Sequence, residues 1–453
     1  MEIYEKLDYI IGTLASLLWG TPLVILLIGG GIFFSFYSRM TPILYFKHAF
    51  QILLGKYDSN DDPGQITHFE ALSSALAGTV GLGNIAGVAV AIHTGGPGAI
   101  FWMWITAILG MSTKFFTCTL AVMYRGYDDK GEIQGGVMHY IEQGLGKKYK
   151  PLSLMFSISG LFGSIVFFQA NQLSQIIRDF IYSPMGIFQN DQSSGDLLTG
   201  IIVATLVGAV IFGGIQRIAK VASRLVPFMV GLYLLAAFII ITNNIVKIPS
   251  IFSMIFHDAF TGDAVTGGAL GSMIIIGVRR GLFSNEAGTG TETMAHGAAK
   301  TSEPVREGLV AMLGPFIDTI IVCSITAIII LISGVYDQEI NGVSMTTLAF
   351  EKELGVIGKI FITIAVLTFA LSTMFSYSFY GRKCASYIFG TSAKNIYNWI
   401  YIVMIIIASG ASIDIAINFV DSAFALMVIP TMVGTLLLSP KVMAEAKKYF
   451  SKL

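Results

Sequence analysis

Long apolar runs recur along this chain, and short polar or charged stretches separate them. A helix needs about 20 mostly apolar residues to cross the hydrocarbon core of a bilayer. The pattern therefore predicts an all-α polytopic membrane protein with about 11 transmembrane helices. The predicted helices cover residues 14–37, 69–93, 98–124, 151–181, 197–214, 224–243, 264–299, 306–334, 355–386, 394–412 and 415–437.

Two of these segments are interrupted by glycine. The first contains "AGTVGLGNIAGVAVA", Ala77 to Ala91, and the second is 264–299, which is also too long for one simple span. Paired interruptions in corresponding positions of two halves are the best sequence indication of a transporter's binding site. Two alternatives are small-residue packing between ordinary helices and a nucleotide-binding loop, which needs a preceding strand.

The spacing of the interruptions predicts an internal repeat. One interrupted helix opens the block 69–243, and the other opens the block 264–437. Five helices reverse the topology, so the blocks are expected to be inverted relative to each other. Residues 1–68 then form an extra N-terminal helix and a connector, and 1–453 is a single membrane domain.

An unwound stretch inside a membrane helix frees backbone groups that hydrocarbon cannot satisfy. Half-helix N-termini suit a carboxylate, and half-helix C-termini present carbonyls that suit Na⁺ or an ammonium group. A zwitterionic amino acid together with Na⁺ matches both signs. We therefore expect a small amino acid to bind between the two interruptions.

Composition and charge support the membrane assignment. The chain is 54% hydrophobic and 12% charged, whereas soluble proteins carry about 25% charged residues. The 28 basic and 28 acidic residues balance, so nothing indicates a nucleic-acid partner. Most lysines and arginines fall in loops that are cytoplasmic if the N-terminus is outside, which predicts a cell-membrane protein with a cytoplasmic C-terminus.

Other functional classes find less support. The motifs Gly-x-Ser-x-Gly and His-Glu-x-x-His of common hydrolases do not occur, so we expect no enzyme and no organic cofactor. The three cysteines and six histidines show no metal-ligand spacing. A channel and a H⁺-coupled transporter remain as alternatives to Na⁺ coupling.

Two further motifs resemble a known family. The run "GGPGAIFWMWITAILG", Gly95 to Gly110, resembles the signature of the sodium:alanine symporters, the alanine/glycine:cation symporter family. "VGLGN", Val80 to Asn84, is similar to the broken first core helix of neurotransmitter:sodium symporters such as the bacterial leucine transporter. The resemblance extends to "GLFSNEAGTGT" and "HGAAKTSEPVREG". It implies a leucine-transporter-like fold of two inverted five-helix repeats and Na⁺-coupled uptake of alanine or glycine.

The resemblance also implies roles for residues at the two interruptions. The amides of Gly81, Leu82 and Gly83 are expected to hold the substrate carboxylate, with Thr79 near the amine. Free carbonyls near the ammonium group, and a narrow pocket, are expected from Ile274, Ile275, Ile276 and Gly277. Related folds line the pocket with a third helix, which points to Phe168, Gln169 and Gln172, although buried amides can equally bond between helices.

For Na⁺, the resemblance implies a site made of oxygen atoms only. The hydroxyls of Ser372 and Thr373 are expected to join the carbonyls of Ala77, Val80 and Phe369, which suits a hard cation. The alternative is that both hydroxyls bond back to the preceding helical turn. Asn84 is either a ligand of a second Na⁺ or a polar contact that steadies the interruption.

Charged residues inside apolar segments are costly and usually paired. They include Lys114, Arg279, Arg280, Glu286, Glu292 and Asp318. Arg279 and Arg280 are expected just after the second interruption, in ion pairs that include Glu286. Direct substrate contact and a proton relay, which would favour H⁺ coupling, are the alternatives.

Overall fold

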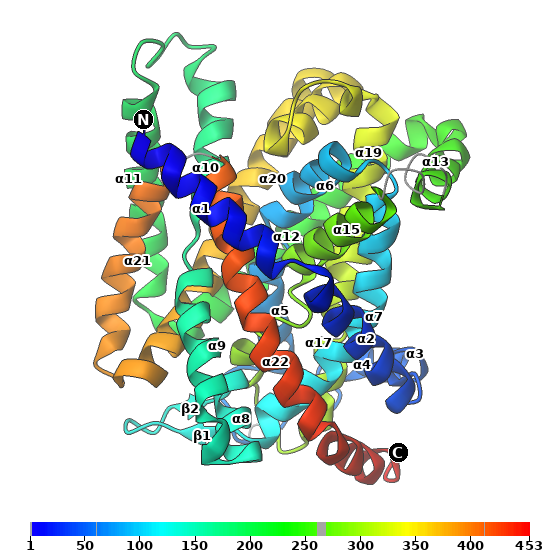
Figure 1. The fold of residues 1–453 in the computed structure, drawn as a ribbon, viewed down its shortest axis with the longest axis vertical. Coiled ribbons are helices and arrows are strands. Elements are labelled where there is room, and N and C mark those ends of the chain that lie inside the picture. Colours follow the sequence, from blue (N-terminus) through cyan, green and yellow to red (C-terminus); the bar gives the residue numbers. More distant parts are fainter. Residues whose placement is uncertain (1, 60, 261–268, 412) are drawn as a thin grey trace.

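The computed structural model describes residues 2–59, 61–260, 269–411 and 413–453 (Figure 1). Residues 264–268 and 412 of the predicted helices lie outside the described residues. The helices run mainly along the long axis of the molecule, with α13 and α6 toward one end and α8 and the C-terminus toward the other. Over these described ranges the arrangement is helical apart from one short two-stranded hairpin.

The helices of the first half bear out the predicted order. They are α1 (Glu2–Leu18), α2 (Thr21–Tyr37), α3 (Thr41–Leu44), α4 (Phe46–Leu53), α5 (His68–Thr79), α6 (Val88–Gly95), α7 (Ala99–Met123), α8 (Val137–Leu145), α9 (Lys150–Gly163), α10 (Phe167–Ile177), α11 (Gln192–Ile211) and α12 (Gly214–Asn243). The strands β1 (Gly126–Tyr127) and β2 (Ile133–Gln134) pair antiparallel between α7 and α8.

The second half repeats this alternation of long and broken helices. Its helices are α13 (Ile248–Phe260), α15 (Ala269–Asn285), α16 (Thr293–His296), α17 (Pro304–Ala311), α18 (Leu313–Pro315), α19 (Ser324–Ser333), α20 (Gly342–Phe389), α21 (Ala393–Ser409) and α22 (Ile413–Phe450). A π-helical stretch, Phe316–Cys323, joins α18 to α19.

Within the described residues, seven helical segments are long and apolar enough to cross a membrane, or nine if each bent pair is one span. Two of the predicted segments fall short of that criterion and correspond to α15 and α21, each described over 17 residues. The figure of about 11 spans from the sequence therefore stays a prediction.

Several predicted helices differ in shape from the structure, among them 151–181, which is divided into α9 and α10. Segment 14–37 is a pair, α1 and α2, bent by 41° next to Gly20 and Pro22. Segment 355–386 is the second part of α20, which bends at Gly355, where φ is +63° and a side chain would be strained. Segment 415–437 lies within α22, which continues past Pro440 to Phe450.

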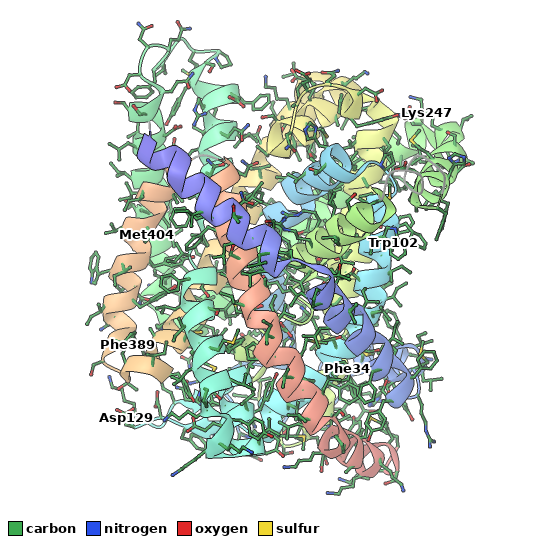
Figure 2. All side chains as sticks on the ribbon, in the orientation of Figure 1. Phe34, Trp102, Asp129, Lys247, Phe389 and Met404 are labelled. Carbon is green, nitrogen blue, oxygen red and sulfur yellow. The ribbon has the colours of Figure 1, made fainter. Side chains whose placement is uncertain are left out.

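Labelled side chains mark the two ends and the middle of the molecule (Figure 2). Asp129 lies in the hairpin at one end and Lys247 at the opposite end, whereas Trp102 and Met404 lie between them. Large apolar side chains are exposed on α12 and α21, including Phe238 and Trp399, as expected where helices face lipid. The innermost element is the first interrupted helix, since every residue from 71 to 92 is buried.

Candidate functional site

The first interruption lies where the sequence predicts it. Helix α5 ends at Thr79, Val80 leaves the helical region at φ −73° and ψ 83°, and a π-helical turn, Gly83–Gly87, leads into α6. The two helical parts are bent by 51°. The Gly81 N–H donates to Asn84 Oδ1 at 2.8 Å, so the Ala77 carbonyl loses its usual helical donor.

Asn84 joins the first interruption to another element. Its Nδ2 donates to Asp318 Oδ1 at 2.6 Å and to the Asp318 carbonyl at 3.0 Å. Ser284 also donates to Asp318, through Oγ at 2.6 Å. All three side chains are fully buried. The amide therefore steadies the interruption, and its predicted role as a ligand of a second Na⁺ stays a prediction.

The second interruption lies later in the chain than the sequence analysis expected. The prediction that Ile274, Ile275, Ile276 and Gly277 have free carbonyls is wrong, because all four lie inside α15, which ends at Asn285. The chain is irregular from Glu286, at φ +55°, to Glu292, and α16 begins at Thr293.

Glycine in α15 serves packing rather than a break. A Cβ atom on Gly277 would lie 2.5 Å from Trp102 Cβ and 2.7 Å from the Ala99 carbonyl oxygen of α7. A Cβ atom on Gly281, four residues on, would lie 3.1 Å from Thr106 Cβ. This is the small-residue packing between helices that a glycine pattern predicts equally well.

The first interruption meets the last turn of α15, just before the second interruption, at an aromatic side chain. A Cβ atom on Gly83 would lie 3.3 Å from the Phe283 ring and 3.4 Å from Ser284 Cα. Phe283 also packs edge-to-face against Phe168, with the ring centroids 5.2 Å apart. The structure thus brings predicted residues Gly83 and Phe168 together around Phe283. The sequence analysis did not assign Phe283, although it lies in the quoted motif "GLFSNEAGTGT".

The hydroxyl pair of α20 lies against the first interruption. A Cβ atom on Gly81 would collide with Thr373 Oγ1. Ser372 and Thr373 both donate to the Phe369 carbonyl, at 2.9 and 3.0 Å. Their hydroxyls therefore make the back-bonds that were the alternative to cation binding, while their acceptor lone pairs stay available.

Polar groups of two predicted pocket residues lack a partner among the described residues. Thr79 Oγ1 and Gln169 Oε1 are buried and make no hydrogen bond there. Gln172 differs, because its Oε1 accepts from the Val343 N–H at 3.0 Å and its Nε2 donates to Asn171 and Gln175. Gln172 thus makes the interhelical bonds that were the alternative to pocket lining, whereas Thr79 and Gln169 have polar atoms left for a ligand.

The charged residues pair differently from the prediction. Arg279 and Arg280 lie before the second interruption, and both pair with Asp421 of α22 rather than with Glu286. The Arg279–Asp421 distance is 2.5 Å. We call Arg279, Arg280 and Asp421 the arginine cluster. The expectation of ion pairs is right in kind, but the partner was not recognised because Asp421 is distant in sequence.

The residues of the second interruption bond to neighbouring helices. Glu286 accepts hydrogen bonds from Tyr377 of α20 and from Thr291. Glu292 Oε1 accepts from Thr117 Oγ1 of α7 at 3.0 Å. Lys114, also on α7, is buried, and its Nζ would lie 3.5 Å from a Cβ atom on Gly314.

A further buried charged group lies at the start of α5 and joins it to α16 and α17. Glu307 of α17 bonds to Nδ1 of His68, at the start of α5, and to Nδ1 of His296 in α16, the latter at 2.5 Å. We call these three residues the histidine cluster. All three are at most 1% exposed. The sequence analysis missed this cluster, because its members are far apart in sequence and show no common spacing.

Backbone bonds surround the histidine cluster. Gln65 N donates to the Ala298 carbonyl at 2.8 Å, and Lys300 N donates to the Ile66 carbonyl at 2.7 Å. Arg125 caps the same strand-like pairing through bonds to the carbonyls of Ala299 and Thr301. The connector before α5 is thereby tied to the segment after α16.

Comparison with known proteins agrees with this arrangement. The model of the sodium:alanine symporter family matches residues 4–453. The sodium/alanine symporter AgcS of Methanococcus maripaludis is 38% identical, over 97% of this chain and 96% of that protein. The "Probable sodium/glutamine symporter GlnT" of Bacillus subtilis is 35% identical, over 98% and 91% of the two chains.

A solved structure shows the same fold. The structure of MhsT in complex with L-phenylalanine aligns with a TM-score of 0.63 and 16% identity, covering 85% of this chain and 93% of that chain. MhsT has the leucine-transporter-like fold, so the predicted fold class is confirmed. The protein is therefore a transporter and not an enzyme, and the chain belongs to the sodium:alanine symporter family of Na⁺-coupled amino-acid carriers.

Proposed function

We propose that this protein couples Na⁺ entry to the uptake of alanine, with glycine as a second substrate, by alternating access. The observation that carries the proposal is the contact of Thr373 Oγ1 with Gly81. This contact brings a hydroxyl oxygen to the point where α5 loses its helical bonds and the Ala77 carbonyl is freed. Oxygen ligands without net charge suit Na⁺ in a membrane.

The substrate is proposed to bind beside this cation, between the two interruptions. The Gly81 N–H is used by Asn84, so the amides of Leu82 and Gly83 are the proposed partners of the carboxylate. Thr79 and Gln169 supply polar atoms for the ammonium group. Phe168 and Phe283 form an aromatic wall beside Gly83, which supports a short substrate side chain.

The proposed orientation places the N-terminus outside and the C-terminus in the cytoplasm, in the cell membrane. The excess of lysine and arginine in alternate loops supports it. The arginine cluster then faces outward and the histidine cluster faces the cytoplasm. Na⁺ binding would steady the interruption of α5 before the substrate arrives, because both sites share this stretch.

The coupling is tested by uptake of radiolabelled alanine into liposomes that contain the purified protein. An inward Na⁺ gradient should drive accumulation, and a proton gradient alone should not. Thr373→Ala should raise the Na⁺ concentration for half-maximal uptake about tenfold, as expected for a lost ligand worth about 1.4 kcal/mol. Equal uptake without Na⁺ would contradict the proposal.

A matched control lies in the same helix. Thr368 makes the same back-bond, to Ile364, but lies on the exposed side of α20. Thr368→Ala should leave the Na⁺ dependence unchanged, which separates a cation ligand from a general effect on α20. Competition by unlabelled D- and L-alanine, glycine and glutamine would then rank the substrates.

A further inference from the structure

The histidine cluster contains an unusual arrangement of buried nitrogen atoms. His68 and His296 each direct Nδ1 at one oxygen of Glu307. With the Glu307 carboxylate as acceptor, both Nδ1 atoms donate, and each Nε2 then carries a lone pair. Both Nε2 atoms are buried and have no hydrogen-bond partner among the described residues.

This arrangement carries a net negative charge when both imidazoles are neutral. A buried carboxylate between two neutral rings is costly in a medium of low dielectric constant. One proton on either Nε2 would convert the group into an imidazolium–carboxylate–imidazole array with no net charge. Each ring has a vacant site for that proton, which is the feature that distinguishes this cluster from an ordinary structural ion pair.

The surrounding charges do not supply this proton-binding capacity. They comprise Arg306, Arg125, Asp58, Glu292, Cys118, His48, Tyr380 and Tyr449. Arginine stays charged at all physiological pH values, and unperturbed tyrosine and cysteine titrate well above neutrality. Glu292 is the one other fully buried carboxylate among them, and it already accepts a bond from Thr117. Glu292 and His48, whose Nε2 lies 2.7 Å from the Tyr449 hydroxyl, are therefore the alternative proton sites.

The position of the cluster links a proton to movement of helices. His68 begins α5, His296 ends α16, and Glu307 lies in α17, so the cluster joins both interrupted helices to a third element. The connector before α5 is also held by backbone bonds, which do not titrate, and by the guanidinium of Arg125, which stays charged. Phe69, beside His68, is 42% exposed, whereas the three residues of the cluster are at most 1% exposed.

We propose that the histidine cluster is a proton-binding site and that its proton holds the α5 end of the interrupted helices closed. The proton comes from water on the side that this end faces and binds Nε2 of His68 or His296. The closed state binds this proton more tightly than the open state, because opening separates the rings from Glu307. Low pH therefore stabilises closure, and closure weakens as the pH rises through the titration of the site.

The test measures Na⁺-driven alanine uptake into liposomes at equal internal and external pH, between pH 5.5 and 8. This readout rests on the proposed function. Uptake should fall at least about threefold toward pH 5.5, within the tenfold per pH unit that one proton allows. His68→Gln and His296→Gln should reduce the dependence to less than about twofold, because each removes one imidazole.

Controls separate the cluster from other titrating groups. His139→Gln replaces a histidine of α8 that packs edge-to-face against Tyr387 instead, and it should keep the full pH dependence. Glu292→Gln should keep it as well. The proposal is overturned if wild-type uptake is independent of pH, if the dependence survives in both cluster variants, or if Glu292→Gln alone removes it.

A second readout is independent of transport. Cys118, on α7 within electrostatic range of Glu307, is buried, and under this proposal a small thiol reagent reaches it when the end opens. Its labelling, corrected for the intrinsic pH dependence of a free thiol, should rise with pH in the wild type and in His139→Gln but not in His68→Gln. If no alanine uptake occurs at any pH, the proposed function fails, while this labelling still decides the proton site.

Discussion

The arginine cluster and the histidine cluster join different helices with different chemistry: the first joins α15 to α22, and the second joins α5, α16 and α17. Asp421 is shared by two guanidinium groups, and Arg279 keeps 20% of its side chain exposed. Glu307 is shared by two imidazoles that are at most 1% exposed, and backbone bonds reinforce that end. Permanent charges near solvent hold one end, and buried titratable groups hold the other.

The difference has a physical consequence for switching. Guanidinium groups stay charged, so the arginine cluster can open only by exchanging one partner for another or for water. Imidazoles change charge near neutral pH, so the histidine cluster can be weakened without a competing ligand. The comparison therefore predicts that a change of pH weakens or strengthens mainly the histidine cluster.

The largest effect is expected from Glu307→Ala. This substitution removes a shared buried acceptor and leaves two imidazole N–H groups unpaired, which should cost about 3–5 kcal/mol of unfolding free energy. Thermal unfolding in detergent, followed by intrinsic fluorescence, would show a much lower midpoint. A change no larger than that of an exposed ion-pair variant would contradict the importance of this cluster.

A smaller loss is expected from Asp421→Asn. The two guanidinium groups then lose their shared carboxylate, but Arg279 can turn toward water, so the cost should be about 1–3 kcal/mol. Labelling of Cys118 should not rise, because the histidine cluster is intact. Faster Cys118 labelling would show that the two ends are coupled rather than separately fastened.

Gly64→Ala tests the backbone part of the histidine end. A Cβ atom at Gly64 would collide with the backbone of Lys300, and relieving such an overlap typically costs about 1–3 kcal/mol. Cys118 labelling should become faster at every pH. Gly231→Ala is the control, because no atom lies within 4 Å of a Cβ atom at that glycine.

The smallest effect is expected at the exposed hairpin near the same end. Burial raises the pKa of Asp128, but hydrogen bonds from Lys394 and from two backbone N–H groups outweigh it and lower this pKa to about 2. A depressed pKa stabilises the fold above pH 4, and that stability is lost as the pH falls from about 4 to about 2. Lys394→Gln should cost less than about 1 kcal/mol at pH 6 and nothing near pH 2, as judged by thermal unfolding.

The sequence determined the broad architecture of this protein. Apolar runs of spanning length, the interruption at Val80 to Asn84 and the family motif are local signals. The interruption and the family are confirmed, and up to nine of the about 11 predicted spans meet the length criterion within the described residues. The order of helices follows from these runs, because a segment's hydropathy decides whether it can be buried in lipid. The resemblance grouped Thr373 with the carbonyls of Ala77 and Val80, and the structure brings its hydroxyl against Gly81, directly after Val80.

Only the tertiary structure decided where the second interruption lies and how the buried charges pair. Gly277 permits either a break or close packing, and the neighbouring Trp102 of α7 decides for packing. Asp421 lies 141 residues from Arg280, and Glu307 lies 239 residues from His68. No local sequence pattern predicts such pairs. In the low-dielectric interior, a buried charge pairs with an opposite charge that lies close to it in space, whatever the distance between the two residues in the sequence.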